Sequence, residues 1–246
     1  APEHENTVSM RMAARVPLVG TAWRVASPVA EAGYDELRKL AVESGDNTAL
    51  AIAMFGQTAH LSMHYQFDAA SRLGSELKAL TRSIDDIDVI ITATFVSMYG
   101  EYQSGRMDGL LNRAQRIIDL CAGDTDRGTR FTRSPLVPAI TLRGIARSAM
   151  GIAGWREDLT ETSRLAVGGE PAAVATALAY KHIFGLGGGL VIPDTAVVDE
   201  TAGLLDVAER FGDDFALSTA RLTHGFVLTF LDGSLRDEGY DLLEQA

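Results

Sequence analysis

Apolar residues recur along the chain at intervals of three and four positions, which is the spacing of one face of an α-helix. One such stripe consists of Ala70, Leu73, Leu77 and Leu80. Comparable stripes lie within residues 110–121 and 204–211. The strict alternation that marks β-strands is rare, and the β-branched run at 89–91 continues into a segment of helical length. The pattern predicts an all-α protein.

The turn signals between these stripes divide the chain into helical hairpins. The first helices of the hairpins are predicted over residues 32–44, 67–82, 107–121, 155–167, 196–211 and 235–245. The second helices are predicted over residues 47–64, 87–103, 136–153, 171–186 and 214–231. A further helix is expected over 11–26, interrupted near Pro17, and residues 1–10 are expected to be frayed.

Two segments of the chain repeat one another. Residues 40–61 align without a gap on residues 207–228 with seven identities. The identities include a glycine followed by an aspartate, as Gly45-Asp46 and Gly212-Asp213. Such a glycine ends one helix in the left-handed conformation, and the aspartate caps the next helix. Small residues that allow close helix packing follow at the same spacing: Ala49, Ala53, Ala216 and Ala220. A weaker third copy begins at Gly169-Glu170.

A second landmark is a turn followed by a bulky apolar residue that opens a helix. It occurs at Phe67, Met107, Trp155 and Leu235, which are separated by 40, 48 and 80 positions. The two landmarks alternate, as turns within and between hairpins must. We therefore expect stacked repeats of about 40 residues.

Two segments interrupt this rhythm, a polar loop at 123–135 and a glycine-rich insertion at 185–195. Both are interpreted as loops inserted into repeats. The domain organisation is expected to be an N-terminal extension over 1–31 and one repeat domain over 32–246. The last repeat of a helical array normally has a polar outer face. The last predicted helix instead carries Leu235, Leu242 and Leu243, so we expect the chain to be a piece of a longer protein or its end to be covered by a partner.

The formal net charge is −11, and the sequence has no basic patch that would suit phosphates. We therefore expect neither nucleic acid nor an anionic membrane surface as a partner. No apolar run reaches the roughly 18–20 residues that span a bilayer. The single cysteine, Cys121, excludes a disulfide within the chain and fits the reducing cytoplasm.

Residues that could carry chemistry are few. His60 and His64 have the spacing of a metal-binding pair on a helix, but the sequence offers no third ligand. The glycine run at 185–189 lacks the lysine of a phosphate-binding loop. Cys121 closes an apolar stripe and is expected to be an inert, buried thiol. We therefore expect no metal and no cofactor, and assign no catalytic residue.

Cations on the first helices of the hairpins are candidates for contacts with a partner, because solenoids commonly bind partners on a concave face. The candidates are Arg72, Lys78, Arg113, Arg116, Arg164 and Arg210. The alternative interpretation is that each is a solvated charge on a helix surface.

The chain resembles tetratricopeptide-like repeats, specifically the longer variety of about 40 residues found in large actinobacterial regulators. The resemblance rests on Gly45-Asp46, Gly123-Asp124 and Gly212-Asp213, followed by Gly105-Arg106-Met107 and Gly154-Trp155. It covers most of residues 32–246 and departs from the pattern at Gln66 and in the two inserted segments. The resemblance implies a right-handed superhelix with a sensory or scaffolding role, as in LuxR-type regulators and multidomain adenylate cyclases.

The leading hypothesis is a regulatory interaction domain of a bacterial signalling or transcription regulator, which binds a protein or peptide partner. A second hypothesis is a sensor that holds a small-molecule effector inside the superhelix, beside residues 123–135 or 185–195. A third is an all-α enzyme, which would need clustered acidic or histidine ligands that the sequence does not show.

Overall fold

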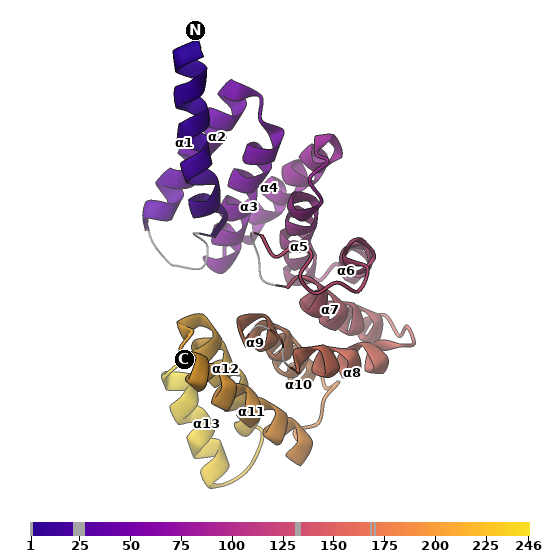
Figure 1. Ribbon diagram of the computed structural model, residues 1–246. Helices are drawn as coiled ribbons and strands as arrows, with labels where there is room; N and C mark the ends of the chain where they lie inside the picture. The colour runs from indigo at the N-terminus through magenta and orange to yellow at the C-terminus, as the bar shows by residue number, and fades with distance from the viewer. Residues whose placement is uncertain (1, 22–27, 131–133, 168, 170) are drawn as a thin grey trace. The chain divides into compact units, whose positions relative to one another are not determined.

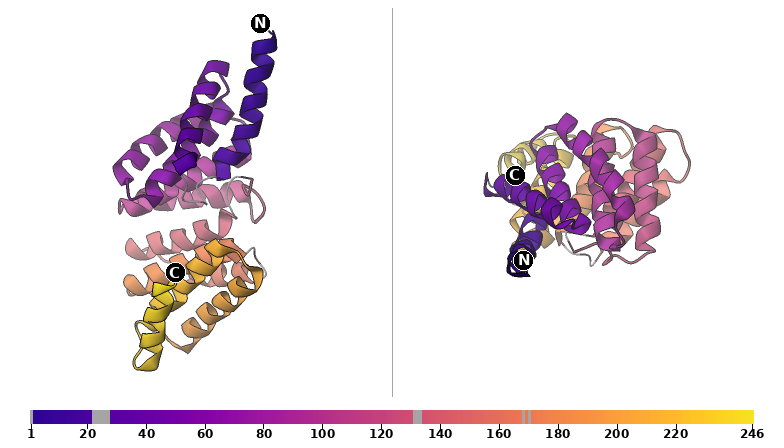
Figure 2. Two further views of the ribbon diagram at one scale, coloured as in Figure 1. Left: turned by 90° about the vertical axis from the view of Figure 1, so that its left-hand side faces the viewer. Right: turned by 90° about the horizontal axis from the view of Figure 1, so that it is seen from above.

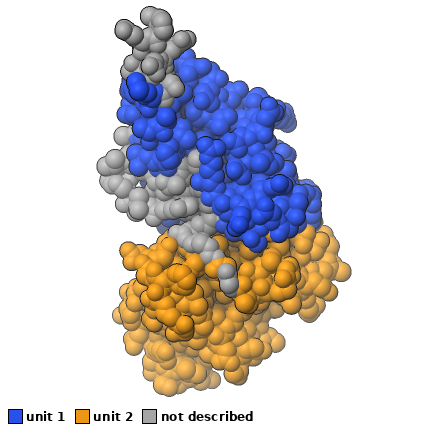
Figure 3. All heavy atoms as spheres, in the orientation of Figure 1, with its two compact units in different colours: residues 1–135 blue, residues 136–246 orange. Residues whose placement is uncertain are grey.

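The computed structural model describes residues 2–21, 28–130, 134–167, 169 and 171–246. These residues form helices and turns, and no strand occurs among them (Figures 1 and 2). The prediction of an all-α protein is therefore confirmed. The chain divides into two compact units, residues 1–135 (unit 1) and residues 136–246 (unit 2), which Figure 3 colours separately.

The helices of unit 1 start and end close to the predicted positions. They are α1 (Pro2–Thr21), α2 (Pro28–Ser44), α3 (Asn47–Met63), α4 (Phe67–Leu80), the short η2 (Thr81–Ser83), α5 (Ile87–Gln103) and α6 (Met107–Cys121). The expectation of a frayed N-terminus is wrong for the described residues, because α1 begins at Pro2 and runs through Pro17. Packing of α1 on α2 and α3 holds this helix together despite the proline. Residues 22–26, also predicted helical, lie outside the described residues.

Unit 2 follows the prediction with two differences. Its helices are α7 (Leu136–Ala149), α8 (Trp155–Ala166), α9 (Pro171–Ala179), the π-helical η3 (Tyr180–Phe184), α10 (Gly185–Gly187), α11 (Thr195–Phe211), α12 (Asp214–Leu228) and α13 (Ser234–Glu244). The helix predicted over residues 136–153 ends earlier, at Ala149, because the chain turns at Met150 and Gly151, where Gly151 has a left-handed φ of 69°. The predicted insertion at 185–195 is shorter than expected, because helical structure continues through η3 and α10 to Gly187. The described part of the 123–135 segment consists of turns and bends, as predicted.

Each unit is built from two rows of helices. In unit 1, α1, α3 and α5 pack side by side and form an inner row. Helix α2 packs on α1 and α3, α4 packs on α3 and α5, and α6 packs on α5, so these three form an outer row. In unit 2, α7, α9 and α12 form the inner row. Helix α8 packs on α7 and α9, α11 packs on α9 and α12, and α13 packs on α12.

The distribution of apolar residues accounts for this division into rows. The inner helix α3 is apolar around most of its circumference, and the buried run from Ala51 to Gly56 is continuous. The outer helix α4 is amphipathic, with Leu73 and Leu77 buried and Glu76 exposed. A helix that is apolar all round must be covered on all sides, whereas an amphipathic helix needs one covered face.

The glycine–aspartate landmarks have the predicted roles. Gly45 and Gly212 adopt φ angles of 72° and 65°, which lie in the left-handed region. Asp46 Oδ1 accepts a hydrogen bond of 2.9 Å from the backbone N–H of Ala49. Asp213 Oδ1 accepts an equivalent bond of 2.9 Å from Ala216. The sequence signal thus fixes where one helix ends and the next begins.

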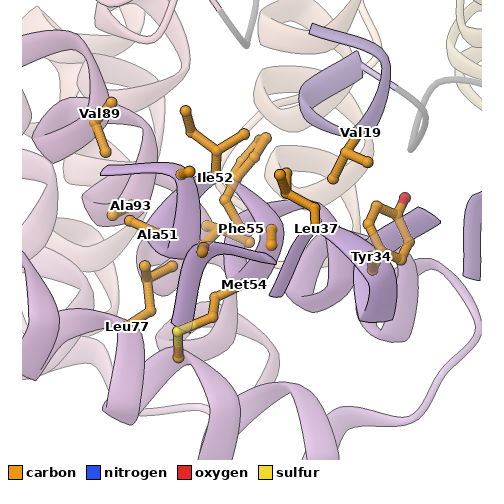
Figure 4. Packing of buried hydrophobic residues seen from close by; sticks show 14 of the residues in the cluster. Val19, Tyr34, Leu37, Ala51, Ile52, Met54, Phe55, Leu77, Val89 and Ala93 are labelled. Atoms are coloured by element: carbon orange, nitrogen blue, oxygen red, sulfur yellow. The ribbon is translucent and has the colours of Figure 1, made fainter. Parts of the chain in front are cut away.

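Small side chains let the inner helices approach their neighbours. Ala49, Ala53, Ala216 and Ala220 are all buried, as the repeat predicted. In unit 1, Phe55, Leu37 and Leu77 fill the space around α3 (Figure 4). The core of unit 2 around α9 and α12 consists mostly of alanines and leucines.

The conformational role of Gly212 can be tested against a glycine in the interior of α11, the helix that Gly212 ends. We expect Gly212→Ala to destabilise the protein by about 1 kcal/mol, because alanine disfavours the left-handed conformation. Gly203→Ala, in the interior of α11, should instead stabilise it by about 0.5–1 kcal/mol. A Cβ at either position meets no atom within 4 Å, so sterics do not separate the two variants. Urea unfolding curves in which both variants shift in the same direction would contradict this assignment.

Candidate functional site

A small pocket lies where the inner helices α3 and α5 of unit 1 meet the outer helices α4 and α6. Its volume is about 30 Å³, which is room for about two water-sized groups. Small residues line most of it, including Thr58, Ser62, Ser71, Gly74, Ser97 and Gly100. Drug-sized ligands occupy pockets of about 300–1,000 Å³, so this pocket suits a single functional group.

The pocket follows from the spacing of small residues along three helices. Thr58 and Ser62 are four positions apart on α3, as are Ser71 and Ser75 on α4. Residues four apart lie on the same face of a helix. Gly74 lies at the centre of this arrangement, because a Cβ built on it would be 3.9 Å from Thr58 Cγ2 and 4.0 Å from Ser97 Oγ.

The hydroxyl groups at the buried end of the pocket are partly engaged. Thr58 Oγ1 donates to the carbonyl of Met54 at 2.7 Å, and Ser97 Oγ donates to the carbonyl of Ala93 at 2.9 Å. Ser62 Oγ is buried and has no hydrogen-bond partner among the described residues. An unpaired buried hydroxyl beside a pocket marks a position where a bound group would gain a hydrogen bond.

Three charged side chains border the pocket. Arg113 donates to Glu101 Oε1 through Nε and Nη2, at 3.1 Å and 2.9 Å. Arg106, at the start of α6, donates from Nε to Glu101 Oε2 at 2.6 Å. Gly109 makes room for this carboxylate, because a Cβ there would lie 2.6 Å from Oε2. With two cations and one anion, the cluster carries a net positive charge.

Burial raises the pKa of the Glu101 carboxyl, but the hydrogen bonds from Arg106 and Arg113 outweigh burial and leave it below the usual value. Glu101 is therefore ionised at neutral pH and fixes the two guanidinium groups. Its side chain is 13% exposed and that of Arg113 is 18% exposed, whereas that of Arg106 is 51% exposed. The cluster thus extends from the interior to solvent.

Of the six predicted contact residues, Arg113 lines this pocket. Arg72, Lys78 and Arg116 are exposed on the outer helices α4 and α6 of the same unit. Arg164 and Arg210 belong to unit 2, where they form ion pairs within their own helices with Glu161 and Asp206. The pocket lining includes none of these five.

Sequence reasoning missed Glu101 and Arg106. Arg106 stands in the Gly105-Arg106-Met107 landmark, which from the sequence alone is interpreted as a turn signal and as part of the repeat motif, with no role for the arginine side chain. Glu101 lies five positions before it, so the two residues face each other across that turn. A glutamate shortly before a Gly-Arg turn is the signal that could have indicated the pair.

A second polar cluster lies in unit 2, around the π-helical segment η3. Glu200 Oε2, on α11, accepts hydrogen bonds of 2.6 Å from both Lys181 Nζ and His182 Nε2. Lys181 Nζ also lies 2.5 Å from Ser163 Oγ on α8. His182 is fully buried, and its Nδ1 has no partner among the described residues. A π-helix shifts the side chains that follow it relative to α-helical spacing, so the sequence pattern could not place this cluster.

Burial alone would raise the pKa of the Glu200 carboxyl. The hydrogen bonds that it accepts from His182 and Lys181 outweigh burial and lower the pKa to about 2. Glu200 therefore carries its charge throughout the neutral range and joins η3 to α11. We interpret this cluster as the polar link that fixes the π-helical segment.

The remaining candidate groups are part of the fold. His64 Nδ1 donates to the carbonyl of His60 at 2.9 Å, so His64 ends α3. Among the described residues, no group of three or more His, Cys, Asp and Glu side chains could hold a metal ion. Cys121 is buried, and burial raises the pKa of its thiol to about 11, which leaves it unreactive at neutral pH.

Neither a scan of the chain against known protein families nor a search among curated proteins gives a match. Among the described helices, none combines the length and the apolar character needed to cross a membrane.

The role of Glu200 predicts how stability depends on pH. Because its folded pKa of about 2 lies below the ordinary value, its contribution is complete above about pH 5 and is lost as pH falls towards 2. We expect Glu200→Gln to cost about 2 kcal/mol at pH 7 and about half of that or less at pH 3. Urea unfolding at the two pH values measures this.

The matched control is Glu209→Gln, which changes an exposed glutamate of the same helix. It should change stability little at either pH. An equal loss for Glu200→Gln at pH 7 and pH 3 would show that the charge of Glu200 does not support the fold.

Proposed function

We propose that this chain is a helical-repeat interaction module that binds a peptide segment of a protein partner, with one side chain of the peptide held in the unit 1 pocket. In this proposal the hairpins of each unit are tetratricopeptide-like repeats that follow one another as in a right-handed superhelix. The alternation of inner and outer helices within each unit supports this architecture.

The observation that carries the proposal is the pocket itself. The helices that build it come from three successive predicted hairpins: α3 from the first, α4 and α5 from the second, and α6 from the third. It is too small to enclose a whole metabolite of ordinary size, but it can hold the end of one side chain. A peptide lying across α4 and α6 would place that side chain in the pocket.

The predicted contact residues extend this surface. Arg72 and Lys78 on α4 and Arg116 on α6 are exposed and belong to the helices that border the pocket. In the proposal they contact the parts of the peptide that remain outside the pocket. Arg164 and Arg210 belong to unit 2 and have no part in this site.

The biological setting that fits this activity is regulation in the cytoplasm. Repeat arrays of the kind that the sequence resembles occur in actinobacterial regulators beside segments with ATPase or cyclase activity. In the proposal this chain supplies recognition, and any catalysis belongs to other segments. The effector hypothesis gains no support from the pocket, because no described residue of 123–135 or 185–195 lines it.

The proposal is tested by selecting peptides on the wild-type chain and measuring how they bind a variant whose pocket is filled by an added methyl group. Peptides selected from a random display library on the wild-type chain should lose at least about tenfold in affinity for Gly74→Ala. The added methyl meets Thr58 and Ser97 at ordinary contact distances of 3.9 and 4.0 Å, so it occupies the pocket without disturbing the helices. Fluorescence anisotropy with labelled peptides measures the affinities.

Gly203→Ala is the matched control, because it makes the same substitution inside a helix of unit 2. It should bind the selected peptides as the wild type does. The proposal fails if selection yields no peptide, or if every selected peptide binds Gly74→Ala and the wild type equally well.

A further inference from the structure

Thr58 and Ser97 line the buried end of the unit 1 pocket, and their hydroxyl oxygens can act as hydrogen-bond acceptors. A hydroxyl group has one hydrogen to donate, and Thr58 and Ser97 have given theirs to carbonyl groups of their own helices. What each oxygen still offers is a lone pair. A group that enters the pocket therefore gains most if it brings N–H or O–H donors to this end.

The outer end of the pocket presents donors. Arg106 lines the pocket, uses Nε to hold Glu101 and has a half-exposed side chain, so the other N–H groups of its guanidinium are donors that a ligand could use. Arg113 lies deeper and keeps the same carboxylate in place through two bonds. A group that enters the pocket therefore needs an acceptor at its outer end.

Ser62 can act either as a hydrogen-bond donor or as an acceptor towards a group in the pocket. Its buried Oγ has no partner among the described residues, and a free hydroxyl can rotate to donate or to accept. Because an unpaired buried hydroxyl costs free energy, a ligand that bonds with Ser62 gains affinity. The pocket thus combines acceptors inside, donors outside and one adaptable group.

We infer that the pocket recognises a primary amide, the end group of an asparagine or glutamine side chain. The amide NH₂ would donate to Thr58 and Ser97, and the amide oxygen would accept from Arg106. This inference rests on the proposed function, because it names the side chain that a bound peptide inserts. The volume of about 30 Å³ suits a group of this size.

The two charged groups of similar size, a carboxylate and an ammonium group, fit the pocket less well than a primary amide. A carboxylate brings acceptors alone, so one of its oxygens would face the lone pairs of Thr58 and Ser97. An ammonium group brings donors alone and would lie beside the two arginines that hold Glu101. Rejecting a group that leaves buried atoms unpaired is worth roughly 5- to 100-fold in affinity.

Three small probes of similar size separate these chemistries: acetamide, acetate and methylammonium. We expect acetamide to shift the backbone amide signals of Gly74 and Gly100 in NMR titrations of the full chain. Acetate and methylammonium should bind at least about fivefold more weakly. Tighter binding of acetate, tighter binding of methylammonium, or no response to acetamide would overturn the inference.

Thr58→Val removes one acceptor while keeping the shape of the side chain. It should weaken acetamide binding at least about threefold. Thr94→Val is the matched control, since Thr94 makes the same bond to its own helix, to the carbonyl of Ile90 at 2.7 Å, and does not line the pocket. Equal acetamide affinity of the Thr58 variant and the control would also overturn the inference.

The selected peptides distinguish this inference from the proposed function. If they depend on the pocket and contain an asparagine or glutamine whose change to aspartate or glutamate weakens binding, both stand. If they depend on the pocket but need no such residue, the inference fails and the interaction module stands. If acetamide binds but no peptide depends on the pocket, the interaction module fails and the amide site remains.

Discussion

The structure depends on covering helices that are apolar on nearly every side. Helix α3 cannot be stable at a surface, because its run of buried residues extends around the helix. Its neighbours α1, α2, α4 and α5 together cover it. The same requirement organises unit 2, where α9 lies among α7, α8, α11 and α12. Amphipathic helices then complete each unit from outside.

The pocket is a consequence of the same packing. Small residues let α3, α4 and α5 approach closely. Where the facing residues on all three helices are serine, threonine or glycine, their side chains do not fill the space between the helices, and the pocket remains. The ion cluster of Glu101 borders this space and holds Arg113 in a defined position. A site built on helices in this way is rigid, which favours selective recognition of one small group.

Local signals in the sequence were sufficient for the helix boundaries at the glycine–aspartate turns. The left-handed Gly45 and Gly212 and the caps Asp46 and Asp213 act within a few residues of themselves, so they can be recognised without the fold. The pocket and the Lys181–Glu200 pair depend on contacts between helices and, in the second case, on a π-helical turn. Helix periodicity contains no information on either. Pro17 misled the prediction because packing on neighbouring helices outweighs the lost backbone bond.

Native-state hydrogen exchange on the full chain tests the two-row arrangement most directly. Amide protons in the middle of the inner helices α3, α5 and α12 should exchange slowest, at the rate of global unfolding of their unit. Those of the outer helices α4, α6 and α11 should exchange faster through local opening. Equal or greater protection of the outer helices would contradict the arrangement in which the inner row forms the core.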